Sequence, residues 1–254
     1  NTPTDVTDVS SINSSTSDYR FTGTLTSTNF ASGAQVNTLG VYRGAAGAYT
    51  LLIADTLTIA SGGLAFANDV TGNTTSIITG GSITTANSST PLYISSSAGT
   101  AGGAITISSS ITGGMDLVIG GNSGITFSGG ANNTYTGTTF INGGQLTLNK
   151  SSGINAVSTN VVVRSGGILV GNQGNNIPDA ATVTIESGGF WNRGTTTEVI
   201  ANLKGGGTVT TANTNSTGIT TITNSVTVGD SGIGTMIIAA ASQAGVTNAF
   251  VMSS

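Results

Sequence analysis

The sequence predicts an all-β chain that is wound as a parallel solenoid of about 12 rungs. Three observations predict this fold. Short runs alternate between apolar and hydroxyl side chains, pairs of glycines recur about every 20 residues, and about half of the 254 residues are Gly, Ser, Thr or Asn. Helix is disfavoured along the whole chain, because these four residue types are weak helix formers.

The apolar residues of the predicted strands alternate with Thr or Ser. A period of two places one set of side chains in a core and the other set at the surface. This pattern predicts short, half-buried strands that include residues 57–59, 105–107, 146–148, 183–185 and 226–228.

Glycine pairs precede strands at 62–63, 102–103, 143–144, 166–167 and 188–189, and a glycine triplet stands at 205–207. A spacing of about 20 residues is typical of one coil of a solenoid, with Gly or Asn at its corners. Stacked Thr, Ser and Asn side chains bond to their copies in neighbouring coils. About 12 coils would form a rod on the order of 55–60 Å long. The alternative is an antiparallel sandwich, although hairpins place turn signals about every 8–12 residues.

The two ends of the chain differ in composition. Residues 1–30 contain four charged residues and are expected to form an N-terminal cap or arm, with the solenoid over 31–254. From residue 205 onward the only charged residue is Asp230. This end is apolar, and we expect it to continue into further coils or to contact a second copy of the chain. The residues expected at that contact are Met236, Ile237, Ile238, Phe250, Val251 and Met252.

Residues 129–150 carry a family resemblance. The segment contains Asn-Thr-Tyr-Thr-Gly-Thr-Thr at 133–139, Asn-Gly-Gly at 142–144 and Leu-Thr-Leu-Asn at 146–149. It resembles the autotransporter-associated β-strand repeat of bacterial passenger domains. Residues 165–167 and 187–189 match the motif more weakly. The resemblance implies a right-handed parallel β-helix, extracellular or on a bacterial cell surface. It implies no particular activity, because passengers with this repeat serve as adhesins, enzymes, toxins or stalks.

Composition excludes several classes of function. The chain has no Cys and no His, so thiol or imidazole metal sites and Ser-His-Asp catalysis are excluded, and we expect no cofactor. Its six basic residues are scattered and the net charge is −4, which argues against nucleic-acid binding. The longest apolar runs are far shorter than the roughly 20 residues of a transmembrane helix.

Two candidate sites remain. Trp191 beside Arg193 suggests a platform on which a sugar ring stacks, although Trp191 could instead fill the coil interior or a corner. Glu186 and Glu198 are the only glutamates and could form a pair of catalytic carboxylates, although a solvated surface cluster is the more common arrangement.

The sequence therefore predicts a structural, extracellular β-solenoid that is not an enzyme. Only 6% of its residues are charged, where about 25% is usual, which suits a surface that is covered by neighbouring rods. The expected partner is the protein itself, in a fibre, sheath, surface layer or passenger stalk. The alternative is an adhesin that binds surface glycans, and a polysaccharide-cleaving enzyme ranks third.

Overall fold

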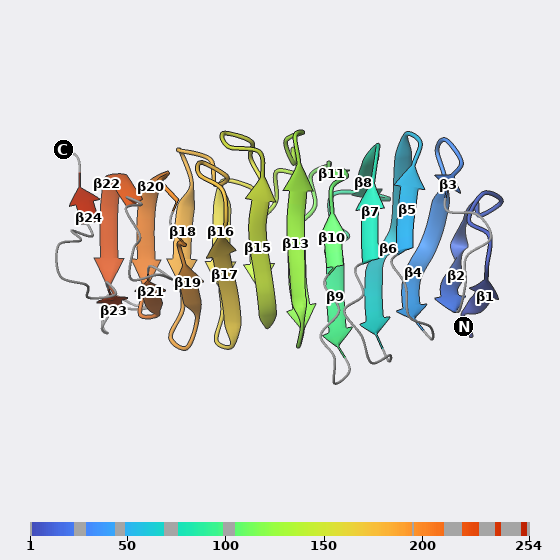
Figure 1. The fold of residues 1–254 in the computed structure, drawn as a ribbon, viewed down its shortest axis with the longest axis horizontal. Coiled ribbons are helices and arrows are strands. Elements are labelled where there is room, and N and C mark those ends of the chain that lie inside the picture. The colour runs from blue at the N-terminus through green and yellow to red at the C-terminus, as the bar shows by residue number, and fades with distance from the viewer. Residues whose placement is uncertain are drawn as a thin grey trace.

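A computed structural model describes residues 2–22, 29–43, 49–68, 76–98, 105–194, 196–210, 220–228, 237–239 and 250–252. These residues form strands, turns and bends but no helix, and none of them could therefore provide a helical membrane span. The strands stack side by side along the long axis of the molecule, with β1 and β24 at opposite ends (Figure 1).

The strands belong to two sheets of 14 and 10 strands. The longer sheet contains, along its main path, β1 (Thr4–Val6), β2 (Ser14–Thr22), β4 (Gln35–Arg43), β6 (Thr56–Asn68), β9 (Leu92–Ala98), β12 (Leu117–Gly121), β14 (Thr139–Ile141), β16 (Asn160–Val163), β18 (Thr182–Ile185), β20 (Glu198–Gly205), β22 (Thr220–Val228) and β24 (Phe250–Met252). Off that path lie β8 (Ser82–Thr85), which pairs with β6, and β11 (Ser110–Ile111), which pairs with β8.

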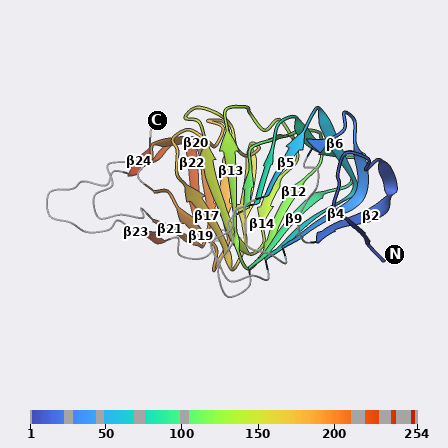
Figure 2. The same ribbon diagram turned by 45° about the vertical axis from the view of Figure 1, so that its right-hand side comes forward.

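The shorter sheet contains β3 (Asn29–Phe30), β5 (Tyr49–Ile53), β7 (Ser76–Thr79), β10 (Ile105–Ile107), β13 (Gly124–Gly129), β15 (Gly144–Lys150), β17 (Gly167–Gly171), β19 (Phe190–Asn192), β21 (Thr208–Thr210) and β23 (Ile237–Ala239). The chain passes from one sheet to the other and back, so that successive coils lie against one another (Figure 2).

Every described strand pair is parallel, which confirms the parallel solenoid and excludes the antiparallel sandwich. The five segments predicted from alternation all lie within strands, namely β6, β10, β15, β18 and β22. A period-two pattern was sufficient here because these strands bury mainly one face, although Thr147 of β15 is buried as well as Leu146 and Leu148.

The expected count of 12 rungs is not supported. The shorter sheet has 10 strands, so fewer than 12 complete turns are present among the described residues. One coil leads from Ile78 to its partner Ile107, and it is longer than the coil that leads from Leu169 to its partner Trp191. The glycine pairs after residue 143 mark only the shorter coils. Extending their period to the whole chain therefore made the predicted coils too short and too many.

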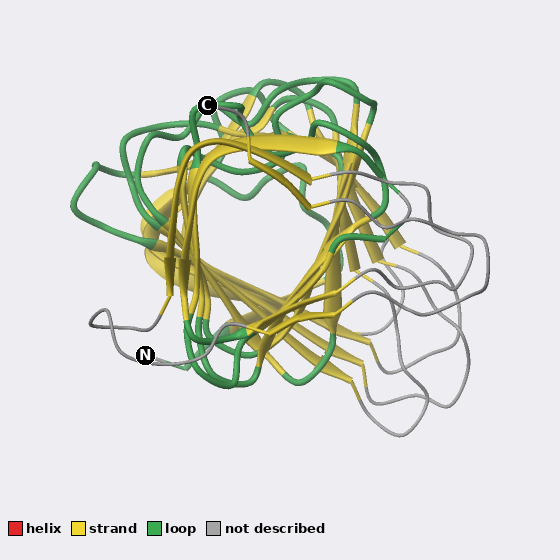
Figure 3. Ribbon diagram, turned by 90° about the vertical axis from the view of Figure 1, so that its left-hand side faces the viewer, coloured by secondary structure: helices red, strands yellow, loops and turns green. Residues whose placement is uncertain are grey.

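Inward side chains form continuous columns that run from coil to coil, and they fill the space that the strands enclose in the end-on view of Figure 3. One column of the longer sheet consists of Leu39, Leu64, Ile94, Ile119, Ile141, Val163 and Ile185, each no more than 1% exposed. Like side chains at one register position pack at the same depth in every coil, which gives the long core its uniform width.

The two glycines of the pairs at 166–167 and 188–189 have different roles. Gly166 and Gly188 have φ angles of 79° and 81°, a region that L-residues with side chains rarely adopt. At the next position, a Cβ atom on Gly167 would press against the carbonyl oxygen of Ile141, and one on Gly189 would lie 2.5 Å from that of Val163. The first glycine therefore makes the turn, and the second lets the backbone of one coil approach the backbone of the coil before it.

Residues 1–30, expected to form a cap or arm, contribute strands to both sheets, because β1 and β2 belong to the longer sheet and β3 to the shorter. Between β1 and β2, Val9 and Ile12 are 0% and 2% exposed and join the hydrophobic core. Phe21 and Phe30 pack edge to face, with ring centroids 6.3 Å apart. Residues of this segment therefore form part of the two sheets and of the hydrophobic core at the N-terminal end of the solenoid.

Candidate functional site

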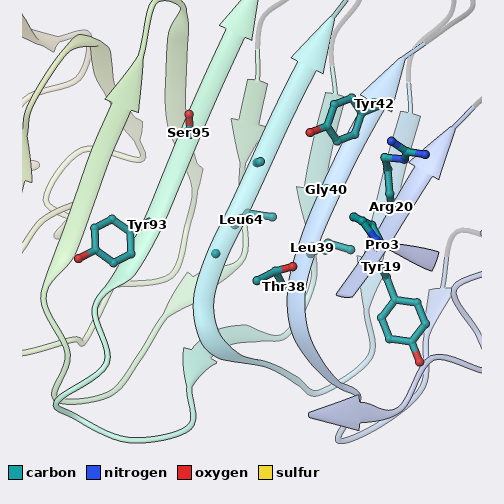
Figure 4. Close-up of a pocket in the computed structure, with 12 residues that line it drawn as sticks. Pro3, Tyr19, Arg20, Thr38, Leu39, Gly40, Tyr42, Leu64, Tyr93 and Ser95 are labelled. Atoms are coloured by element: carbon teal, nitrogen blue, oxygen red, sulfur yellow. The ribbon is translucent and has the colours of Figure 1, made fainter. Parts of the chain in front are cut away.

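Exposed aromatic rings gather on the outer face of the longer sheet, over β2, β4, β6 and β9. Tyr93 and Tyr42 are 50% and 38% exposed, and only Leu52, on the other sheet, is a comparably exposed large apolar residue in the described part of the chain. The two tyrosines border a shallow depression of about 270 Å³ (Figure 4). We call this surface the tyrosine platform.

Register explains why the floor of the platform is flat. Gly40 pairs with Ala65, and Ala65 pairs with Ser95, so three successive coils present small residues at one position. In the neighbouring column Gly63 stands between Thr38 and Tyr93. The floor therefore has no large side chain between the two rings, which lie at opposite corners of it in Figure 4.

The ring of Tyr42 lies along the sheet surface. A Cβ atom on Gly40 would lie 2.7 Å from the Cε2 atom of Tyr42, so the absence of a side chain at Gly40 makes room for the ring. The guanidinium carbon of Arg20 lies 5.6 Å from the centroid of the same ring, within the range of a cation–π interaction. These two contacts hold the ring in place while leaving part of it open to solvent.

Arg20 is neutralised by Asp5. Its Nε and Nη2 atoms donate to the two carboxylate oxygens at 2.6 and 2.9 Å, in the bidentate geometry that arginine favours. Hydrogen bonding to Arg20 lowers the pKa of Asp5, and the same bond raises the pKa of Arg20, so both groups stay charged. The pair adds no net charge to the platform.

Trp191 does not form a surface platform. Its side chain is 1% exposed, and it lies in an inward column with Leu146, Leu169 and Val209. The alternative interpretation, in which the indole fills the coil interior, describes its position. A signal for this was present in the sequence, because Leu146, Leu169 and Trp191 each follow the second glycine of a pair at the same distance.

Arg193 is 5% exposed and serves the corner that follows β19. Its Nη1 atom donates to the carbonyl oxygen of Thr196 at 2.8 Å, and the hydroxyl of Thr196 donates to the carbonyl oxygen of Arg193 at 2.9 Å. Burial lowers the pKa of the guanidinium. Neither Trp191 nor Arg193 offers the exposed surface that the predicted sugar site requires.

The two glutamates are not neighbours. Glu186 follows Ile185, which pairs with Gly205 at the end of β20, whereas Glu198 begins that strand. At about 3.3 Å per residue, more than about 20 Å separates their positions along the sheet, where a glycosidase pair needs roughly 5–9.5 Å. The idea of a catalytic pair therefore fails on geometry.

Glu198 instead has a structural role at a corner of the solenoid. It is 3% exposed, and its carboxyl oxygens accept the backbone N–H groups of Asn176 and Ile177 at 3.3 and 3.0 Å. Burial raises the pKa of this carboxyl to about 8 despite those hydrogen bonds. The adjacent Asn175 is the one non-glycine residue with positive φ in the described ranges, at 52°. Glu198 therefore stabilises this tight corner through hydrogen bonds from the next coil toward the C-terminus.

The segment that resembles the autotransporter repeat forms the equivalent corner two coils closer to the N-terminus. Asn133 is 5% exposed, accepts the N–H of Ile111 at 3.0 Å and donates to the carbonyl oxygen of Ala156 at 2.7 Å. The hydroxyl of the buried Tyr135 lies 2.5 Å from that of Thr139. Polar residues of the motif thus satisfy backbone groups of the coils on either side and are structural.

The C-terminal residues expected at a self-contact are only partly described. Ile237 and Ile238 lie in β23, and Phe250, Val251 and Met252 form β24. Met236 lies outside the described residues. Each of β23 and β24 is the last strand of its sheet in the described part of the chain.

Within the described ranges, no three Asp or Glu side chains come together as a metal site would require. Comparison with family models, with curated proteins and with solved structures gave no match. The resemblance of residues 129–150 therefore rests on the motif itself.

Proposed function

We propose that the protein is a structural, extracellular β-solenoid of a bacterial cell surface, acting as a stalk or scaffold and not as an enzyme. The observation that carries the proposal is the continuous stack of parallel strands with columns of like side chains in its core. The strands of the shorter sheet, spaced by about 4.8 Å, span on the order of 45 Å. Such a stack holds its two ends a fixed distance apart, which is what a stalk requires.

Several further features support a surface role. The chain is stabilised without disulfides, since it has no Cys, and its charged fraction is 6%. A surface with few charges loses little solvation when rods lie side by side. We take the coil to be right-handed, because crossovers between parallel strands of one sheet almost always are. The motif at 129–150 fits the same function, although it defines no activity.

Self-association would use the C-terminal edge. At this end β24 and β23 are the last described strands of the two sheets. An uncovered strand edge can pair with another chain. We therefore propose that β23 and β24 contact a second copy of the chain or further coils of the same rod.

Light scattering and negative-stain electron microscopy of the purified chain test this proposal. We expect short rods that associate as concentration rises. Ile237→Lys, which places a charge on the edge strand β23 at the register of the partly exposed Thr208, should reduce association, while Leu52→Lys at an exposed position of β5, away from that edge, should not. Compact monomers with no rod shape would contradict the scaffold. Rods that remain monomeric at high concentration would contradict self-association alone.

A further inference from the structure

The tyrosine platform carries the two most exposed aromatic rings of the described residues. Phe140 and Phe190 also face outward but are partly buried, and the largest side chains, such as Trp191, are in the core. An exposed tyrosine ring leaves apolar surface in contact with water, and a ligand that covers the ring removes that surface from water. Two such rings lie on one small surface with no large side chain between them. This arrangement contributes nothing to the packing of the core.

The spacing of the rings sets the size of a ligand. Tyr93 stands two strands from Thr38 at the same register, and Tyr42 lies four residues further along the strand of Thr38. Strand spacing and rise per residue then place the two tyrosines about 16 Å apart. A ligand that touches both rings is extended and contains several ring-sized units.

The shape of the platform favours flat, rigid units. Its floor of Gly40, Gly63 and Ala65 has no deep pocket for a protruding side chain, which protein partners commonly use as an anchor. Pyranose rings present flat C–H faces that stack on an aromatic ring, with hydroxyl groups around their rims. Tyr42, Tyr93, Thr38 and Ser95 supply hydroxyl groups at the border of the depression.

The charged groups in and beside the depression favour an uncharged ligand. Arg20 is the one basic residue that lines the depression, and it is already paired with Asp5. Beside the depression, the carboxylate of Asp18 accepts hydrogen bonds from the hydroxyl of Thr38 and the amide of Asn37, both at 2.7 Å, and these bonds lower its pKa. The lining residues therefore offer no unpaired positive charge to an acidic polysaccharide or a phosphate, and Asp18 repels both.

We propose that the tyrosine platform binds an extended, uncharged oligosaccharide, with one sugar ring stacked on Tyr42 and another, several units along the chain, on Tyr93. Binding of this kind gives the scaffold a place to attach to a neutral polysaccharide, such as one on another cell. It moves the predicted glycan contact from Trp191 and Arg193, which are buried, to the other end of the molecule.

The experiment is isothermal titration of the full chain with a set of neutral hexasaccharides of the cello-, chito- and xylo- series, and with an acidic oligogalacturonide. We expect at least one neutral hexasaccharide to bind and the acidic one not to bind. Tyr42→Ala and Tyr93→Ala should each lower the affinity about tenfold, equivalent to about 1.4 kcal/mol. Tyr42→Phe keeps the ring and should retain most of the affinity.

Leu52→Ala is the matched control, because Leu52 is 39% exposed but lies on the other sheet. It should leave binding unchanged, and an unchanged melting temperature shows that each variant folds. The proposal fails if no neutral hexasaccharide binds at millimolar concentration, if both Tyr→Ala variants bind as the parent does, or if the acidic probe binds better. A dimer that Tyr93→Ala dissociates, without saccharide binding, would instead identify the platform as a protein contact. None of these outcomes bears on rod shape, so the scaffold proposal is tested separately.

Discussion

The coils of residues 105–210 and those of residues 2–98 share one backbone plan and both bury aromatic residues, but they differ in the aromatic rings that they expose. Tyr135 and Trp191 of the first region and Phe21 of the second are each no more than 3% exposed. Among the described residues, only the second region exposes large aromatic rings, at Tyr42 and Tyr93, which are 38% and 50% exposed. Because neighbouring positions of a strand face opposite sides, a shift of one residue converts a core aromatic into a surface aromatic.

The two regions also differ in regularity. From Ile105 to Trp191 the coils are of nearly equal length, as the successive partners Ile125, Leu146 and Leu169 show. The coil before this region, from Ile78 to Ile107, is longer than any of them. We infer that the regular region chiefly provides stability, while the less regular region has room for a functional surface. Four predictions test this contrast, from the largest expected effect to the smallest.

Trp191→Ala should be the most destabilising change. Removing the largest fully buried side chain leaves a cavity in a packed column, and such changes cost about 3–5 kcal/mol. Tyr93→Ala, a comparable truncation at the surface, should change stability by less than about 0.5 kcal/mol. Thermal unfolding followed by circular dichroism measures both. Equal losses for the two variants would remove the distinction between the regions.

Glu198 should make the stability of the regular region depend on pH. Its pKa is about 8 in the folded chain, against 4.5 ordinarily, so the folded chain holds a proton that the unfolded chain has lost between these pH values. Stability should therefore fall as pH rises from about 4.5 to 8, by a total on the order of 2–4 kcal/mol. Urea unfolding at pH 5 and pH 7.5 measures the fall.

The matched variant for this prediction is Glu198→Gln, which cannot ionise. It should be less sensitive to pH over the same range. The carboxylates with lowered pKa, Asp5 and Asp18, titrate below this range. Burial lowers the pKa of Lys150 to about 8, so this lysine makes stability rise with pH only above about 8. A pH dependence that persists unchanged in Glu198→Gln would assign it to another group.

The two glycines of a corner should respond differently to alanine. Gly166→Ala meets no atom within 4 Å, so only its positive φ opposes the change, at a cost of about 1 kcal/mol. Gly167→Ala places a methyl group against the carbonyl oxygen of Ile141 and should cost more, about 2–3 kcal/mol. Melting temperatures of the two variants decide the order. The reverse order would mean that the turn, and not the approach of coils, requires glycine here.

The smallest effect should come from removing single tyrosine hydroxyls. Tyr135→Phe removes the 2.5 Å contact with the hydroxyl of Thr139 in the buried corner, at a cost of about 1 kcal/mol. Tyr42→Phe removes a hydroxyl from an exposed ring and should leave stability unchanged. Denaturant midpoints of the two variants can be compared directly. A larger loss at Tyr42 would indicate that its hydroxyl has a structural partner.

Local sequence patterns were sufficient to predict much of the fold. Alternation of apolar residues with Thr and Ser defined strands such as 105–107 and 183–185, because a half-buried strand has only two faces. The glycine pairs marked the corners, because their residues turn with positive φ or let two coils approach closely. Aligning those pairs would also have placed Trp191 in the core beside Leu169.

The stacking of the coils determines which residues from different coils lie together, and local sequence patterns do not specify this. The tyrosine platform combines Tyr42 and Tyr93, which are far apart in the sequence, and its flat floor exists only because Gly40, Ala65 and Ser95 share one register. The same register separates Glu186 from Glu198, which are close in the sequence. Pairing between coils depends on the length of each coil, and no short segment of sequence specifies that length.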